Sequence, residues 1–205
     1  MIQEFQAGGG TMWFLLACAV LGIALVLERL YTLFIRLNVD VKKFSSTVIQ
    51  AVDKQGVQAG IAVCDKSKSP VARVLRAALL KADQGKTAME DAIVAAGTSE
   101  LAFLDRGMPL LAGLTTVAPF FGFLGTVTGM IGAFRSVAAV GEVDPTVVAS
   151  GISEALITTK WGLMIAAPLA IVVILFQGRI NSYLRDMETS SAQLLDVVIT
   201  KTGKQ

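Results

Sequence analysis

The chain has 205 residues, of which 54% are hydrophobic, and its mean hydropathy is +0.65. This composition is more apolar than that of a usual soluble domain, even before the 19 glycines are counted. The net charge of +2 is too small to indicate a nucleic-acid-binding protein. The sequence has no histidine, so the usual zinc ligand and the usual general base are missing. We therefore expect no metal, no cofactor and no enzymatic activity. Any proton transfer would use carboxylates, hydroxyls, water or the groups of a partner.

Three long apolar runs predict three membrane-spanning helices. The first run meets charge at Glu28 and Arg29, which indicate an anchor at the water interface. We place the spans at residues 12–35, 108–135 and 152–177, after a flexible lead at 1–11. The lead is not expected to belong to a cleavable signal peptide, because no basic residue precedes the apolar run.

Residues 36–107 predict a small helical domain. Apolar residues recur there at helical spacing, and a few glycines and Pro70 divide the segment into three or four helices. The segment carries no catalytic constellation. The chain after the third span, 178–205, is predicted to be a helical extension with a charged face.

The distribution of basic residues predicts the orientation of the spans. Eleven of the 18 Lys and Arg residues lie between Arg36 and Arg106, and four lie after the third span. Basic residues favour the cytoplasmic side of a membrane. We therefore expect 36–107 and 178–205 to be cytoplasmic. The lead 1–11 and the short loop 136–151 are then periplasmic.

Hydroxyl and carboxyl side chains interrupt the last two spans. A lone threonine in a membrane helix is usually structural, because its hydroxyl bonds back to a carbonyl one turn earlier. The density here favours one wall of an ion pathway, formed by Thr126, Thr158, Thr159 and Glu154. Glu154 has an alternative interpretation as an interfacial carboxylate that a helix dipole stabilises.

Lys160 is an uncertain charge within the third span. It follows Glu154 by six residues, about 240° around a helix, so the two side chains cannot simply pair. Lys160 either extends its ammonium group to the outer interface or pairs with an acid on another chain, and the first alternative is the more ordinary one.

Small residues in the second span predict close helix packing. Gly122, Gly125 and Gly129 follow Pro119 at spacings of three and four residues, which let helix backbones approach each other. The packing could lie within one chain or between copies. One chain with three spans cannot enclose a pore, so conduction would need several copies or a partner helix.

Two segments resemble a known family. Residues 118–129, APFFGFLGTVTG, are similar to the second-helix motif of the MotA/TolQ/ExbB proton-channel family. Residues 151–163, GISEALITTKWGL, followed by Ala166-Ala-Pro168, resemble its third-helix motif. Length and span number favour the ExbB/TolQ branch over the flagellar MotA branch. A gliding or flagellar-type stator subunit and a non-conducting membrane scaffold remain as alternatives.

The resemblance implies an all-α polytopic protein of the bacterial inner membrane. It implies a homopentamer around a dimer of single-span partners of the ExbD/TolR type, each carrying a membrane Asp, with a TonB-like protein as a further partner. The complex would use the proton motive force for TonB-dependent import or a Tol-like envelope function. By motif position, Thr126 and Thr159 would surround the partner's Asp, and Glu154 would lie at the outer approach. Lys160 departs from the small or apolar residue expected there.

Overall fold

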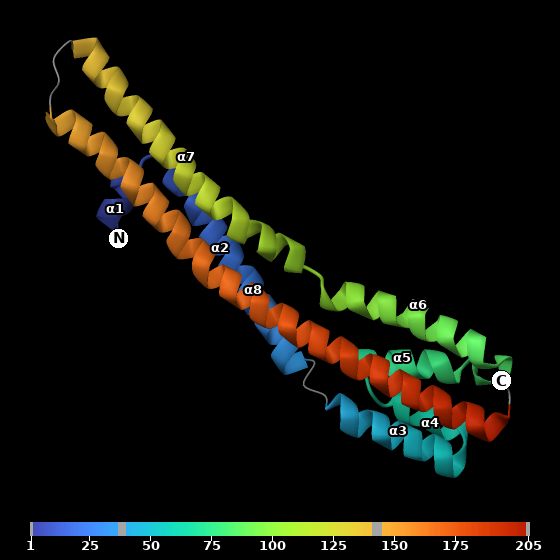
Figure 1. Cartoon of the computed structure of the whole chain (residues 1–205). Helices are drawn as coiled ribbons and strands as arrows, with labels where there is room; N and C mark the ends of the chain where they lie inside the picture. Colours follow the sequence, from blue (N-terminus) through green and yellow to red (C-terminus); the bar gives the residue numbers. More distant parts are fainter. Residues whose placement is uncertain (1, 37–39, 141–144, 204–205) are drawn as a thin grey trace. The chain divides into compact units, whose positions relative to one another are not determined.

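The computed structural model describes residues 2–36, 40–140 and 145–203, and all its regular elements are helical within that part of the chain. The all-α prediction is therefore confirmed (Figure 1). The α-helices are α1 (Ile2–Ala7), α2 (Thr11–Leu30), α3 (Val41–Gln55), α4 (Val57–Asp65), α5 (Pro70–Leu79), α6 (Lys86–Leu104), α7 (Met108–Val140) and α8 (Pro145–Thr202). A π-helical turn at Tyr31–Arg36 follows α2, and a 3-10 turn at Ala82–Gln84 precedes α6.

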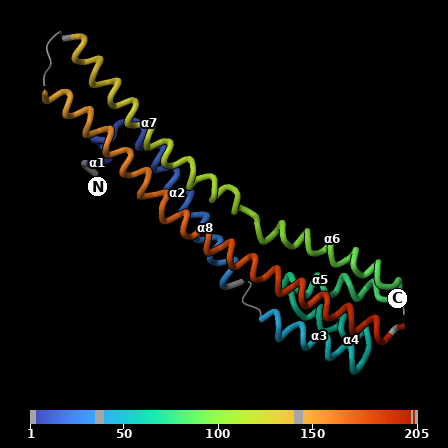
Figure 2. The backbone as a smooth tube through the Cα atoms, viewed as in Figure 1, coloured from blue at the N-terminus to red at the C-terminus, as the bar shows by residue number. Residues whose placement is uncertain are grey.

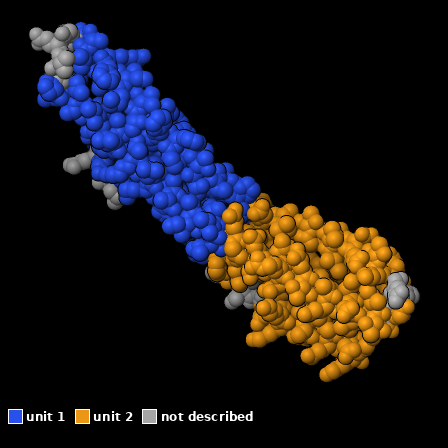
Figure 3. All heavy atoms as spheres, viewed as in Figure 1, with its two compact units in different colours: residues 1–30, 107–175 blue, residues 31–106, 176–205 orange. Residues whose placement is uncertain are grey.

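The chain forms two compact units (Figure 3). The first contains residues 1–30 and 107–175, and the second contains 31–106 and 176–205. Helix α8 contributes residues to both units, as the backbone trace shows (Figure 2).

The first unit is built from α2, α7 and the first part of α8. Within the described residues, three helical segments are long and apolar enough to cross a membrane, at Thr11–Phe34, Met108–Ala139 and Pro145–Lys201. This agrees with the three predicted spans. Large apolar side chains on the unit's surface, such as Phe120, are exposed. Exposed apolar side chains are the expected exterior of helices that face hydrocarbon.

Helix α2 packs on both other long helices of this unit. The rings of Phe14 on α2 and Phe121 on α7 stack with centroids 5.2 Å apart. Gly22 of α2 is buried against Leu169 of α8. Leu15 of α2 lies in the buried core of the unit.

Helices α7 and α8 extend beyond the predicted spans. Helix α7 continues to Val140 and α8 begins at Pro145, so both ends of the predicted loop 136–151 are helical. Residues 141–144 lie outside the described part of the chain. The membrane boundaries of the spans and the side on which each segment lies stay predictions.

The second unit contains α3 to α6 and the C-terminal part of α8, where the sequence predicts three or four helices and a helical extension. Ser69 caps α5 by accepting a hydrogen bond from the Ala72 backbone N–H at 3.3 Å, and Pro70 occupies the first turn. The apolar face of α5 is fully buried, which explains the helical spacing in the sequence. The buried core of the second unit includes Val48, Val71, Leu75, Leu79, Met89, Leu104 and Leu194.

Candidate functional site

The backbones of α7 and α8 approach each other closely at two glycines of α7, Gly122 and Gly129, and at Gly162 of α8. A methyl group added at Gly122 would lie 3.0 Å from the Thr158 carbonyl oxygen, and one added at Gly129 would lie 3.1 Å from the Gly151 carbonyl oxygen. Gly162 of α8 approaches α7 as closely, because a methyl group there would lie 2.8 Å from the Ala118 carbonyl oxygen. These distances are shorter than ordinary van der Waals contacts, so the absence of side chains at the glycines lets the polar faces of both helices come together.

Thr158 is fully buried in this contact. Its side chain occupies the space that a methyl group at Gly125 would need. Its hydroxyl donates a hydrogen bond to the Ala155 carbonyl oxygen at 2.8 Å, one turn earlier on its own helix. In the single chain Thr158 therefore has a packing role, and its predicted place in the lining of an ion pathway is not tested by this geometry.

Thr159 and Thr126 are half-buried and differ in their hydrogen bonds. The line of contact between α7 and α8 is called the seam. Across it, the Thr159 hydroxyl donates a hydrogen bond to the Gly122 carbonyl oxygen at 3.2 Å. The Thr126 hydroxyl donates to the Phe123 carbonyl oxygen at 2.5 Å on its own helix. A hydroxyl oxygen that donates can still accept. Both threonines can therefore solvate a further polar group, and Thr159 also joins the two helices.

Pro119 lies inside α7 and is half-buried. A proline in a helix has no N–H for the carbonyl four residues earlier, which here belongs to Thr115. The Thr115 hydroxyl donates to the Ala112 carbonyl oxygen at 2.7 Å. Membrane helices tolerate proline where neighbouring groups replace the lost hydrogen bonds.

Glu154 lies in the third turn of α8, because that helix begins at Pro145. The helix dipole acts mainly within the first turn, so it does not account for this carboxylate. The Glu154 carboxylate instead lies against Gly9, in the turn between α1 and α2, where an added methyl group would overlap it. The structure therefore does not favour the helix-dipole alternative.

A hydroxyl-rich cavity of about 550 Å³ lies beside Glu154, between the end of α7 and the start of α8. Its hydroxyl groups come from Thr128, Ser136, Thr146 and Ser150. Sequence reasoning missed the last three, which fall in the predicted loop. Thr146, Ser150 and Glu154 are spaced four residues apart, so helical periodicity would have placed them on one face.

Lys160 pairs with Glu4 of α1, with 2.5 Å between the ammonium nitrogen and a carboxylate oxygen. Its ammonium nitrogen also lies 5.8 Å from the centre of the Trp161 ring. Neither sequence-based alternative included a partner 156 residues away in the same chain. The hydrogen bond from Lys160 lowers the pKa of the exposed Glu4 carboxyl below its ordinary value. Lys160 therefore contacts α1, whereas its neighbour Thr159 contacts α7.

No cluster of three or more metal-binding side chains occurs within the described residues. The contact between α7 and α8 thus offers hydroxyls, backbone carbonyls and the carboxylate of Glu154. These groups can hydrogen-bond a protonated or ionised acid, or ordered water.

Three membrane-crossing helices with a polar seam define a polytopic membrane protein, and comparison with known proteins identifies its family. The model of the MotA/TolQ/ExbB proton channel family matches residues 66–189, which include both sequence motifs. The chain belongs to this family.

Two curated relatives cover most of the chain. The biopolymer transport protein exbB1 of Vibrio cholerae is 34% identical over 172 residues, which are 82% of this chain and 75% of that protein. A putative biopolymer transport protein ExbB homolog of Methanothermobacter thermautotrophicus is 27% identical over 188 residues, 92% of this chain and 67% of that one. The solved structure of C. jejuni MotAB has the same fold. It superimposes with a TM-score of 0.65 at 15% identity and covers 86% of this chain and 69% of that chain.

Proposed function

We propose that the chain is a proton-channel and stator subunit of an inner-membrane motor complex. Five copies surround a dimer of single-span partners of the ExbD/TolR type, whose membrane Asp takes and releases protons. The complex passes work from the proton motive force to a periplasmic or outer-membrane process, such as TonB-dependent import or a Tol-like envelope function. Membership of a proton channel family supports the channel role, and the relatives named as biopolymer transport proteins support the ExbB-like branch.

The observation that carries the proposal is the composition of the seam. Helix α7 contains no Asp or Glu, and α8 contains none between Glu154 and Asp186. The half-buried hydroxyls of Thr126 on α7 and Thr159 on α8 lie in these carboxylate-free segments. Hydroxyls can hydrogen-bond both forms of a carboxyl group, but they do not titrate near neutral pH. The acid that takes and releases protons beside these threonines is therefore proposed to come from another chain.

The polar cavity beside Glu154 supplies the outer end of this path. Its hydroxyls can hold the water that carries protons to the threonines. In the predicted orientation this cavity opens to the periplasm, where the proton motive force delivers protons. The cytoplasmic side then holds 36–107 and 178–205, with most of the basic residues.

Valine substitutions of the two threonines test the path. The chain and its partner are reconstituted in vesicles, and proton uptake is followed with a pH-sensitive dye under an imposed gradient. Thr126→Val and Thr159→Val should each lower partner-dependent flux at least about tenfold, since a hydrogen bond to a charged group contributes roughly 1.5–3 kcal/mol. Thr159→Ser should restore the flux.

Thr115→Val is the matched control, because Thr115 is a half-buried hydroxyl on the same helix that is not among the residues predicted to line the path. It should leave proton flux unchanged. Full proton flux in the Thr126→Val/Thr159→Val double variant would contradict the proposal that these two threonines line the proton path. If the unsubstituted complex shows no partner-dependent flux, the chain is a non-conducting scaffold.

A further inference from the structure

The N-terminal lead contacts α8 at two places within the first unit. The Glu4 carboxylate pairs with Lys160, and the turn at Gly9 lies against the carboxylate of Glu154. The earlier residue of the lead meets the later residue of α8, so the lead runs antiparallel to that helix. Six residues separate Glu154 from Lys160, a rise of about 9 Å along the helix. The lead is therefore attached to α8 at two separate points beside the polar seam.

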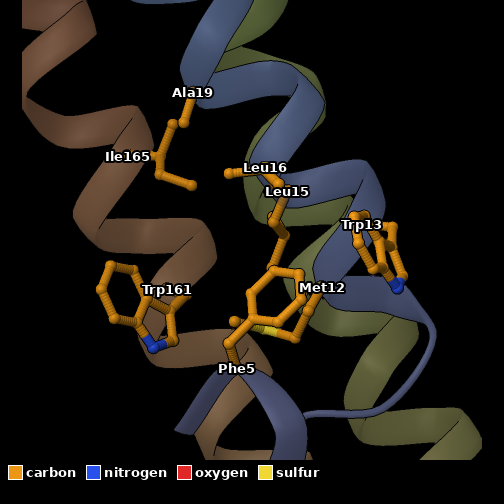
Figure 4. A pocket seen from close by; sticks show the side chains of 8 residues that line it. All are labelled: Phe5, Met12, Trp13, Leu15, Leu16, Ala19, Trp161 and Ile165. Atoms are coloured by element: carbon orange, nitrogen blue, oxygen red, sulfur yellow. The ribbon is translucent and has the colours of Figure 1, made fainter. Parts of the chain in front are cut away.

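Further contacts fix α1 in this position. The ring of Phe5 meets that of Trp13 edge-on, with centroids 5.1 Å apart. Figure 4 shows Phe5 between α2 and α8, where it lines the same apolar pocket as Met12. The Gly8 backbone N–H donates a hydrogen bond to the Glu4 carbonyl oxygen at 2.9 Å, which joins α1 to the turn that follows it. This turn is thus held from both of its sides.

Two features of Gly9 oppose a side chain at this position. Its φ angle is +66°, in the left-handed region that residues other than glycine rarely adopt. A methyl group added there would also overlap Oε1 of Glu154 and would lie 3.1 Å from its Cδ. Gly10, the next residue of the same turn, has nothing within 4 Å of an added methyl group. The close approach to Glu154 is therefore specific to Gly9.

Glu154 joins this turn to the polar cavity. It lines the cavity of about 550 Å³ together with Thr146 and Ser150, while its carboxylate lies against Gly9. A charged group within a span requires water or a partner nearby. A free glutamate side chain samples many rotamers, and packing against a neighbour reduces that freedom. Contact with the turn therefore restricts Glu154 to positions at the edge of the cavity.

We propose that Gly9 is a positioning residue for Glu154, and that the ion pair between Glu4 and Lys160 holds the turn against this carboxylate. The lead then presents Glu154 to the water of the polar cavity, at the outer end of the proton path. This role rests on the proposed function, because the position of Glu154 affects proton flux only if the seam conducts. It gives a task to a segment that the sequence predicts to be only a flexible lead.

Alanine substitutions at two adjacent glycines test this role. Gly9→Ala should lower partner-dependent proton flux about tenfold, as expected for the loss of one hydrogen bond to a charged group. Gly10→Ala is the matched control and should leave the flux unchanged, because its methyl group meets no other atom within 4 Å. Proton flux is measured on the reconstituted complex, and circular dichroism checks that both variants fold. Equal flux in the two variants would overturn the proposal.

A shorter acid separates displacement of the Glu154 carboxylate from backbone strain. Glu154→Asp withdraws the carboxylate by one methylene group, so a methyl group at Gly9 should no longer overlap it. Gly9→Ala should lower the midpoint of unfolding in mixed micelles. Roughly half of this loss should disappear in the Glu154→Asp background, because overlap and left-handed strain cost similar amounts. An equal loss in both backgrounds would assign the effect to strain alone and would overturn the proposal.

Glu4→Gln tests the second contact and replaces Gly9→Ala if that variant does not fold. It weakens the ion pair with Lys160 and leaves Gly9 and Glu154 intact. Proton flux should fall about two- to fivefold, the effect of an exposed ion pair. Gln6→Ala, at an exposed position of α1, is the control and should leave the flux unchanged. Unchanged flux in Glu4→Gln would overturn the role of the ion pair.

Failure of the positioning role differs from failure of the proposed function. Normal flux in the unsubstituted complex and in Gly9→Ala would overturn the positioning role alone. No partner-dependent flux in the unsubstituted complex would overturn the proposed function and the positioning role with it. The unfolding measurement needs neither the partner nor flux, so it decides in either case whether Gly9 and Glu154 are coupled.

Discussion

At the scale of single residues, neighbours along α8 serve different surroundings. Thr158 is buried against Gly125, Thr159 bonds to the Gly122 carbonyl, and Lys160 pairs with Glu4. Successive helical residues point about 100° apart, which accounts for these three environments. A polar residue in a span is therefore assigned a role by its direction and not by its polarity alone.

Alanine substitutions of two glycines on α7 test the seam. Gly125→Ala should destabilise the chain by about 1–3 kcal/mol, because the new methyl group would overlap Thr158. Gly132→Ala is the control, since nothing lies within 4 Å of its added methyl group. It should be neutral or slightly stabilising through helix propensity. Unfolding in mixed micelles measures both, and equal effects would contradict the close packing at Gly125.

The pairing of Glu4 with Lys160 predicts an acid-induced release of α1. The folded pKa of Glu4 is lowered from 4.5, so the stabilising contribution of the pair is present above pH 4.5 and is lost as pH falls through the folded pKa. In a Trp161→Phe variant, Trp13 fluorescence should change in that range, because Trp13 touches Phe5.

Glu4→Gln should remove this acid transition. An acid transition that persists in Glu4→Gln would contradict the role of Glu4.

At the scale of elements, ion pairs of different burial join the helices of the second unit. Arg73 of α5 makes a two-point contact with Glu100 of α6, whose side chain is only 11% exposed. Arg76 of α5 pairs with Asp65 of α4 at 2.5 Å, and both side chains are about half exposed. Burial decides how much each pair matters, because exposed pairs are screened by water.

Methionine substitutions separate the two pairs. Arg73→Met leaves the Glu100 carboxylate buried without this partner and should cost about 2–3 kcal/mol, below the fully buried value because Arg73 is 47% exposed. Arg76→Met should cost less than about 1 kcal/mol. Chemical denaturation followed by circular dichroism measures both. A larger loss in Arg76→Met would contradict this ranking.

At the scale of the whole molecule, three membrane-crossing helices present polar groups that no single chain can enclose. Native mass spectrometry of the purified chain should find five copies of the 21.6 kDa subunit. The number five is what the family resemblance implies, and the polar faces favour association because polar groups within a membrane usually face water, a partner or other copies. A stable monomer or dimer would contradict the pentamer.

Apolar runs and motifs were sufficient to predict the helical class, the three spans and the family. These properties follow from local signals, because hydrophobic length and residue period do not depend on distant parts of the chain. The same reasoning selected Thr126, Thr159 and Glu154 from their polarity within apolar segments. It could not find Ser136, which lies outside the predicted spans but lines the cavity beside Glu154.

The sequence by itself determined what crosses the membrane and which side chains are polar there. Only the tertiary structure decided which of these side chains meet. Thr158 packs against Gly125, and Lys160 pairs with Glu4, which lies near the N-terminus. The physical reason is that such contacts depend on how each helix is rotated toward its neighbours. Close glycine packing sets that rotation, and no local pattern reports it.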